Sequence, residues 1–86
     1  MKVRREGQCL IADIHGMRVE AARFRLQTLA ESCGADIREI VVIHGYHGGQ
    51  ALKDMVREEL TSPRILSIRP ALNEGQTVIT LRGNGR

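Results

Sequence analysis

The chain has 86 residues, of which 42% are hydrophobic, and it carries a formal net charge of +3. This length predicts one domain with a modest core, and the apolar content excludes a chain that is disordered throughout. The positive charge permits a polyanionic partner such as nucleic acid but does not require one.

Two cysteines, Cys9 and Cys33, stand far apart with no Cys-x-x-Cys spacing. That pattern is neither a disulfide framework nor a zinc knuckle, and it is typical of reduced thiols in the cytoplasm. The longest apolar runs have about five residues, whereas a membrane-spanning helix needs roughly 20. We therefore expect a cytoplasmic protein without a membrane segment. Residues 1–86 should form one domain, with a core at about 9–82 and flexible ends at 1–7 and 83–86.

The first predicted element is a strand over Cys9–Ile14, a short apolar run that ends at His15 and Gly16. Side chains alternate between the two faces of a strand, so Ile11, Asp13 and His15 share one face. A carboxylate and a histidine thus lie on the same side of the strand end.

The hydrophobic period then changes. Apolar residues at spacings of three and four predict a helix over Val19–Cys33, which Gly34 is suited to end. The β-branched run Ile40–Ile43 is apolar at every position, which is typical of a strand in the centre of a sheet. This second strand also ends in histidine and glycine, at His44 and Gly45.

A second helix is predicted at about Gly49–Leu60, and Pro63 follows its end. The runs at 64–72 and 76–83 alternate between apolar and polar residues and predict the two strands of a hairpin. The order β-α-β-α-β-β indicates an α/β chain, folded as an α+β two-layer sandwich with a four-stranded mixed sheet.

The two strands that end in His-Gly are expected to be parallel neighbours, because a helix connects them. Their carboxyl ends then meet at one edge of the sheet, with His15 and His44 about 5–10 Å apart. Ligands of open α/β sheets collect at such edges. The segment His44–Gly49 is rich in glycine and leads into a helix N-terminus, where free N–H groups favour an anion such as phosphate.

Each of these residues also has a purely structural interpretation. Gly16 and Gly45 can serve tight turns, a histidine at a strand end can simply be hydrogen-bonded, and Asp13 can orient His15 or cap the first helix. The convergence of two histidines, a carboxylate, several glycines and a helix start nevertheless favours a functional anion site.

The two His-Gly segments resemble the signatures of the Smr (small MutS-related) domain family. "ADIHGMRVEAA", residues 12–22, is similar to its Leu-Asp-Leu-His-Gly opening. "VIHGYHGGQAL", residues 42–52, is similar to its second signature, His-Gly-x-Gly-x-Gly followed by a helix. The resemblance extends over about Leu10–Leu81. It implies a small stand-alone member, with a two-layer sandwich resembling the C-terminal domain of translation initiation factor three.

The resemblance further implies binding to DNA or RNA, with nicking or endonuclease activity in several members. In that family the first signature is implicated in cleavage and the glycine-rich loop in nucleic-acid contact. The candidate catalytic residues are therefore Asp13, His15 and His44. The candidate nucleic-acid or phosphate-binding residues are Gly16, Gly45, Tyr46, His47, Gly48, Gly49 and Lys53.

Two departures from the family pattern bear on cleavage. His47 stands where the second signature has glycine, and Tyr46 stands where many members carry lysine. Tyr46 can stack on an unpaired base or pack over its own loop. Lys53 and Arg57 lie one helical turn apart, and their face is either a phosphate contact or a solvated surface. The resemblance thus supports binding more directly than cleavage.

In a cleavage mechanism His15 is the first candidate for general base or acid, oriented by Asp13. His44 or His47 would supply the second proton transfer or hold a phosphate. RNA cleavage needs no metal because the 2′-hydroxyl is the nucleophile, whereas DNA nicking requires an activated water and suits a divalent ion at Asp13. No metal site is assigned, since a zinc set of Asp13, His15, His44 and His47 lacks a clear ligand spacing.

The sequence leaves three functions open. The first is a nucleic-acid-binding domain with endonuclease activity, a hydrolase of phosphodiester bonds. The second is a non-catalytic module that binds nucleic acid or a ribosome or repair complex. The third is a binder of a small phosphate ligand. Whether the domain is an enzyme, which cofactor it uses, DNA versus RNA, and the oligomeric state all remain open.

Overall fold

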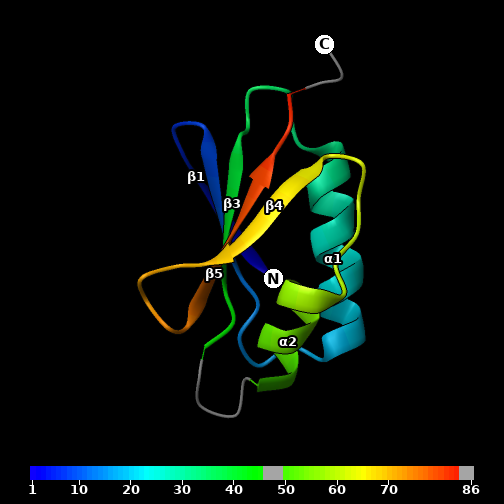
Figure 1. The fold of residues 1–86 in the computed structure, drawn as a ribbon, viewed down its shortest axis with the longest axis vertical. Coiled ribbons are helices and arrows are strands. Elements are labelled where there is room, and N and C mark those ends of the chain that lie inside the picture. The colour runs from blue at the N-terminus through cyan, green and yellow to red at the C-terminus, as the bar shows by residue number, and fades with distance from the viewer. Residues whose placement is uncertain (46–49, 84–86) are drawn as a thin grey trace.

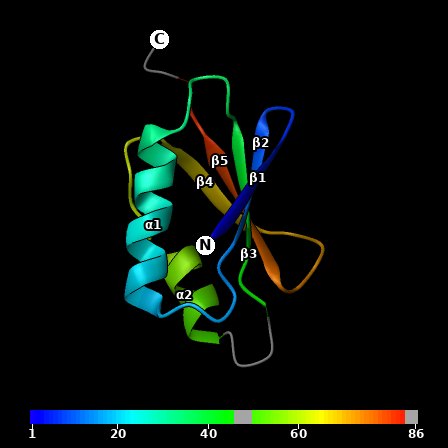
Figure 2. The ribbon, with the colours of Figure 1, turned by 180° about the vertical axis from the view of Figure 1, so that it is seen from behind.

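The computed structural model describes residues 1–45 and 50–83. Its elements in chain order are β1 (Lys2–Glu6), β2 (Cys9–Asp13), α1 (Val19–Ser32), β3 (Glu39–Ile43), α2 (Gln50–Glu58), β4 (Ile65–Pro70) and β5 (Gln76–Leu81). The strands form one mixed sheet in the order β1-β2-β3-β5-β4. Both helices cover the same face of this sheet and leave the other face open (Figure 1; Figure 2). The fold is therefore the predicted two-layer α+β sandwich.

The two helices contribute small and aliphatic side chains to the core. In α1 the buried residues Ala22, Leu26 and Ala30 recur every fourth position, which keeps them on one stripe of the helix. In α2 the buried residues are Leu52, Met55 and Val56. No helix in the described part of the chain is long and apolar enough to cross a membrane.

The sheet has its apolar side under the helices because side chains alternate along each strand. β3 lies between β2 and β5, pairing parallel with β2 and antiparallel with β5, which confirms its predicted central position. Its residues Ile40 and Val42 are completely buried beneath the helices. Val41 and Ile43 point to the open face and are only half-buried. The expected hairpin is also confirmed, since β4 pairs antiparallel with β5.

The predicted four-stranded sheet is wrong by one strand. Lys2–Glu6 forms β1, which pairs antiparallel with β2 along its whole length. This segment was expected to be part of a flexible end because it is highly charged. A strand at the edge of a sheet, with every residue exposed, has no need of the apolar alternation that marks a core strand. The sequence signal for it was the turn at Gly7 and Gln8, where glycine adopts φ = 62° in a two-residue hairpin loop.

Candidate functional site

β2 and β3 end side by side, as predicted from the helical crossover between them. Asp13 pairs with Ile43 in the parallel register, and the backbone N–H of Ile14 donates to the carbonyl of Ile43 at 2.9 Å. Both following glycines have positive φ, 80° at Gly16 and 77° at Gly45, so any other residue would strain these turns. The two glycines thus have a conformational role whatever else the site does.

The loops that follow the two strands also meet. A Cβ placed on Gly45 would lie 3.8 Å from the Cβ of His15. The register explains this contact: Asp13 aligns with Ile43, so the next residues along put His15 beside Gly45 rather than beside His44. The two His-Gly pairs are therefore staggered by one residue.

Asp13 and His15 form a compact pair on the exposed side of this edge. One carboxylate oxygen of Asp13 accepts the backbone N–H of His15 at 3.1 Å and lies 2.5 Å from its ring Nδ1. A carboxylate only accepts, which places the ring proton on Nδ1 and leaves Nε2 for proton exchange. The His15 side chain is 70% exposed, so a large substrate can reach it.

The pKa of Asp13 lies below its usual value. Burial by itself raises this pKa, but the hydrogen bonds from the His15 ring and backbone, together with the nearby charges of His15 and Lys2, outweigh burial. Asp13 is consequently a carboxylate at neutral pH and can hold the imidazole ring in one tautomer and orientation.

His44 lies on the opposite side of the sheet, within the core. Its side chain is 1% exposed. The Nδ1–H donates to the carbonyl of Gly45 at 2.8 Å, and Nε2 lies 2.9 Å from the hydroxyl of Thr77. That hydroxyl also accepts the Nε–H of Arg57 at 3.0 Å, so it donates its own proton to Nε2. A chain of hydrogen bonds runs from α2 through β5 to the turn after β3.

This environment favours the neutral imidazole of His44. Burial lowers the pKa of His44, and the positive charges of Arg57 and Lys53 lower it further. The hydrogen bond to the Gly45 carbonyl acts in the opposite direction and raises this pKa, but burial is the larger effect. The expectation that His44 joins His15 in proton transfer does not fit this position, because both ring nitrogens are occupied by internal partners. His44 instead holds the turn that presents Gly45 to His15.

The remaining predicted residues divide into two groups. Lys53 is half-buried on α2 and borders a hollow of about 220 Å³ together with Arg57, Pro70, Ala71 and Glu74. Arg57 is not a free phosphate contact, since it donates to Thr77 and, at 3.5 Å, to the carbonyl of Gln76. The predicted binding residues Tyr46, His47, Gly48 and Gly49 lie outside the described residues.

The role of Thr77 escaped the sequence interpretation. Alternation along 76–81 puts this hydroxyl on the same face as Ile79 and Leu81, and a polar residue at a core position calls for a buried partner. That alternation was the signal which could have revealed it. Among residues 1–45 and 50–83, no three His, Cys, Asp or Glu side chains are grouped closely enough to hold a metal ion.

Comparison with known proteins shows similarity to one protein family and to a solved structure. The model of the Smr domain matches residues 12–82 of this chain. The crystal structure of the Smr domain of Thermus thermophilus MutS2 is similar in fold, with a TM-score of 0.66 and 25% sequence identity, over 84% of this chain and 96% of that one. No match is found among the curated proteins. The family match includes both strand ends of the site, whereas β1 lies outside it.

Proposed function

The chain belongs to the Smr domain family, and from this we propose that it binds DNA or RNA where β2 and β3 end and cleaves a phosphodiester bond there. Smr domains are known as nucleic-acid-binding and nuclease-like domains. The observation that carries the proposal is the Asp13–His15 pair, a 2.5 Å contact between a carboxylate and an exposed imidazole at a strand end.

In this proposal His15 exchanges protons through Nε2, while its Nδ1–H remains hydrogen-bonded to the carboxylate of Asp13. On RNA, Nε2 takes the proton of a 2′-hydroxyl, the 2′-oxygen bonds to the adjacent phosphorus, and the bond from phosphorus to the 5′-oxygen breaks, with a water molecule giving that oxygen its proton. This route needs an accessible base and a proton donor for the 5′-oxygen, and it needs no metal ion. On DNA, water must replace the 2′-hydroxyl as nucleophile. No metal-assisted step is proposed, because no third His, Cys, Asp or Glu side chain of the described residues joins Asp13 and His15 in a group that could hold a metal ion.

A second candidate is a module that binds nucleic acid without cutting it. The burial of His44 favours this alternative, because it withdraws one of the two histidines that were expected to share proton transfer. Binding requires only cations and backbone N–H groups, whereas cleavage by proton exchange also requires a group to protonate the leaving oxygen.

The test is a panel of end-labelled single- and double-stranded DNA and RNA, incubated with and without chelator. We expect cleavage by the wild type and a loss of about 100-fold or more in rate for His15→Ala, the usual size of a general acid–base contribution. Binding of the same substrates should change only a few-fold. Asp13→Asn should also slow cleavage, since an amide oxygen orients the ring less firmly than a carboxylate.

Asp36→Asn is the matched control for Asp13→Asn. Asp36 is an exposed carboxylate paired with Arg5, and it precedes β3, so it lies at the far end of the parallel strands. It should cleave at the wild-type rate. Equal rates for His15→Ala and the wild type would remove His15 from the mechanism. Salt-dependent binding with no cleavage on any substrate would establish the non-catalytic alternative.

A further inference from the structure

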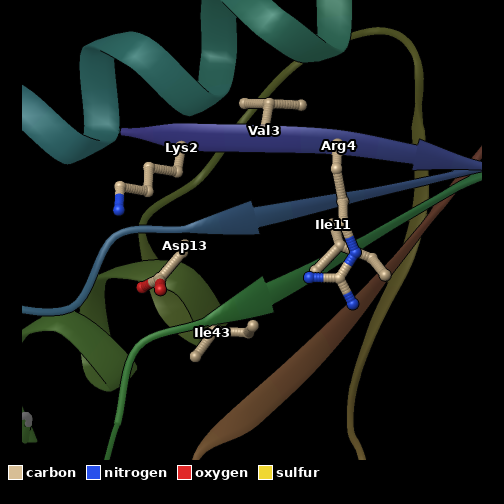
Figure 3. A pocket seen from close by; sticks show the side chains of 6 residues that line it. All are labelled: Lys2, Val3, Arg4, Ile11, Asp13 and Ile43. Atoms are coloured by element: carbon tan, nitrogen blue, oxygen red, sulfur yellow. The ribbon is translucent and has the colours of Figure 1, made fainter.

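A groove on the open face of the sheet leads to Asp13 from the side of β1. It has a volume of about 240 Å³ and is lined by Lys2, Val3, Arg4, Ile11, Asp13 and Ile43. Figure 3 shows Lys2 and Arg4 extending from the same side of β1, with Arg4 over Ile11, whereas Val3 points to the other side. The groove therefore has cations along one wall, an apolar floor and the candidate catalytic carboxylate at one end.

The strand register fixes this arrangement. Lys2 pairs with Asp13 and Arg4 with Ile11 in the antiparallel β1–β2 ladder, and directly paired residues point to the same face. The charge of Lys2 already acts on Asp13, since it helps to lower the pKa of that carboxyl. Lys2 is thus held within electrostatic reach of the proposed site by backbone pairing and not by a flexible tail.

Among residues 1–45 and 50–83, Arg4 has one side-chain partner, and that partner holds it weakly. Its Nε lies 3.0 Å from a carboxylate oxygen of Glu6, and the two side chains are 68% and 59% exposed. An ion pair this open to solvent contributes little, so a phosphate can compete for the guanidinium. The terminal nitrogens of Arg4 also supply donors in a geometry suited to a phosphate.

We infer that Lys2 and Arg4 bind the phosphodiester backbone of the nucleic acid on the β1 side of Asp13, with sugar or base over Ile11 and Ile43. This inference rests on the proposed function and extends it, because it gives the polynucleotide a direction across the sheet. A strand with one phosphate at His15 continues into the groove. The contacts come from β1, which lies outside residues 12–82 matched by the Smr family model, so the inference rests on this chain's own structure and not on the family match.

The cation-lined wall favours a polynucleotide over a peptide or a second copy of the chain as occupant. A peptide would pair with the outer backbone of β1 and would not depend on two side chains above the sheet. A second copy would bring its own Lys2 and Arg4 towards these cations, and like charges repel. A phosphate chain has the complementary charge and repeats it at every nucleotide.

The test measures binding of a short oligonucleotide to full-length protein at several salt concentrations. For Lys2→Gln combined with Arg4→Gln, we expect binding about two- to fivefold weaker per lost cation. The slope of log affinity against log salt should fall by about 0.7 per lost contact on single strands and about 0.9 on duplex. Arg5→Gln is the control, and its effect is compared with the effect per lost cation of the double variant: it removes one positive charge from the same strand, but Arg5 pairs with Asp36 and points to the other face.

Glu6→Gln provides an independent test, in which the binding affinity should change in the direction opposite to that of the double variant. It releases Arg4 and removes a negative charge beside the groove, so binding should become tighter and the salt slope steeper. The inference is overturned if the double variant and Arg5→Gln have equal effects per lost cation on affinity and slope, or if Glu6→Gln has no effect. Failure of the wild type to bind any polynucleotide would instead overturn the proposed function as well, so the two failures are distinct.

Discussion

At the scale of single residues, two identical His-Gly pairs acquire different roles from a stagger of one position. His15 lies two residues after Asp13 and shares its open face of the sheet. His44 lies one residue after Ile43, the partner of Asp13, and therefore points to the opposite face, under the helices. A shift of one residue in register moves a side chain to the opposite face. The His15 side chain is therefore exposed to solvent, whereas the His44 side chain is buried and supports the turn.

The role of His44 predicts a pH dependence of stability. The folded state lowers the pKa of His44, mainly through burial, so protonation is easier in the unfolded chain. The contribution of neutral His44 to the free energy of unfolding is fully present above the unfolded-state pKa of about 6.5, and it is lost progressively as pH falls below that value. We expect the melting temperature of the wild type to fall between pH 7.5 and pH 5.

His44→Asn is the variant that checks this dependence. Its amide N–H can still donate to the carbonyl of Gly45 while the titrating group is removed. The variant should be destabilised, by about 1–3 kcal/mol for the bond lost at Thr77, and its melting temperature should change less between pH 7.5 and pH 5. Melting temperatures are measured by circular dichroism. If they change equally with pH in the wild type and in His44→Asn, His44 is not the source of the pH dependence.

At the scale of elements, one arginine joins the end of α1 to the loop before β3 and to the residue that follows β5. Arg64 donates to backbone carbonyls, with its shortest bond, 2.6 Å, to Cys33. The accepting carbonyls belong to Ala30, Cys33, Gly34, Ile37 and Arg82. The last turn of α1 has no basic residue of its own, so Arg64 supplies the positive charge that favours a helix C-terminus.

Replacement of Arg64 by lysine should destabilise the fold although the charge is kept. A single ammonium group cannot span carbonyls that two guanidinium nitrogens now reach, so several are left without a donor. We expect a loss of about 2–3 kcal/mol in the free energy of unfolding, measured by urea titration. Arg25→Lys, an exposed change on α1, is the control and should be neutral. A neutral Arg64→Lys would show that these bonds do not hold the elements together.

At the scale of the whole molecule, the sheet is covered on one face only, and its strands differ in how they are secured. β3 is paired on both sides and its alternate residues are buried under the helices. β1 has one neighbour, and all five of its residues are exposed. The proposed phosphate-binding residues Lys2 and Arg4 thus lie on an edge strand whose residues are all exposed.

Native-state hydrogen exchange should separate these two strands. The amides of β3 should exchange only through global unfolding, whereas those of β1 that pair with β2 should open at a lower free energy. Addition of an oligonucleotide should raise the protection of β1 if Lys2 and Arg4 hold it. Equal protection of both strands in the free protein would contradict this difference in local stability.

The sequence predicted most of the fold because the core follows simple periodicities. Apolar spacing of three and four located α1, and the β-branched run at Ile40–Ile43 located the central strand. The strand β1 was missed because four of its five residues are charged and all five are exposed, and charge in an edge strand resembles charge in a frayed end. Its pairing with β2 uses backbone groups and leaves no apolar alternation in the sequence of β1 itself.

For this protein, the sequence by itself determined the two-layer architecture, the shared edge of β2 and β3, and the pairing of Asp13 with His15, because each depends on local spacing and chain order. Only the tertiary structure decided that His44 is buried with Thr77 and that Lys2 faces Asp13. Both depend on strand register, which is set by how whole faces pack. A shift of one residue in that register exchanges the buried side chains for the exposed ones.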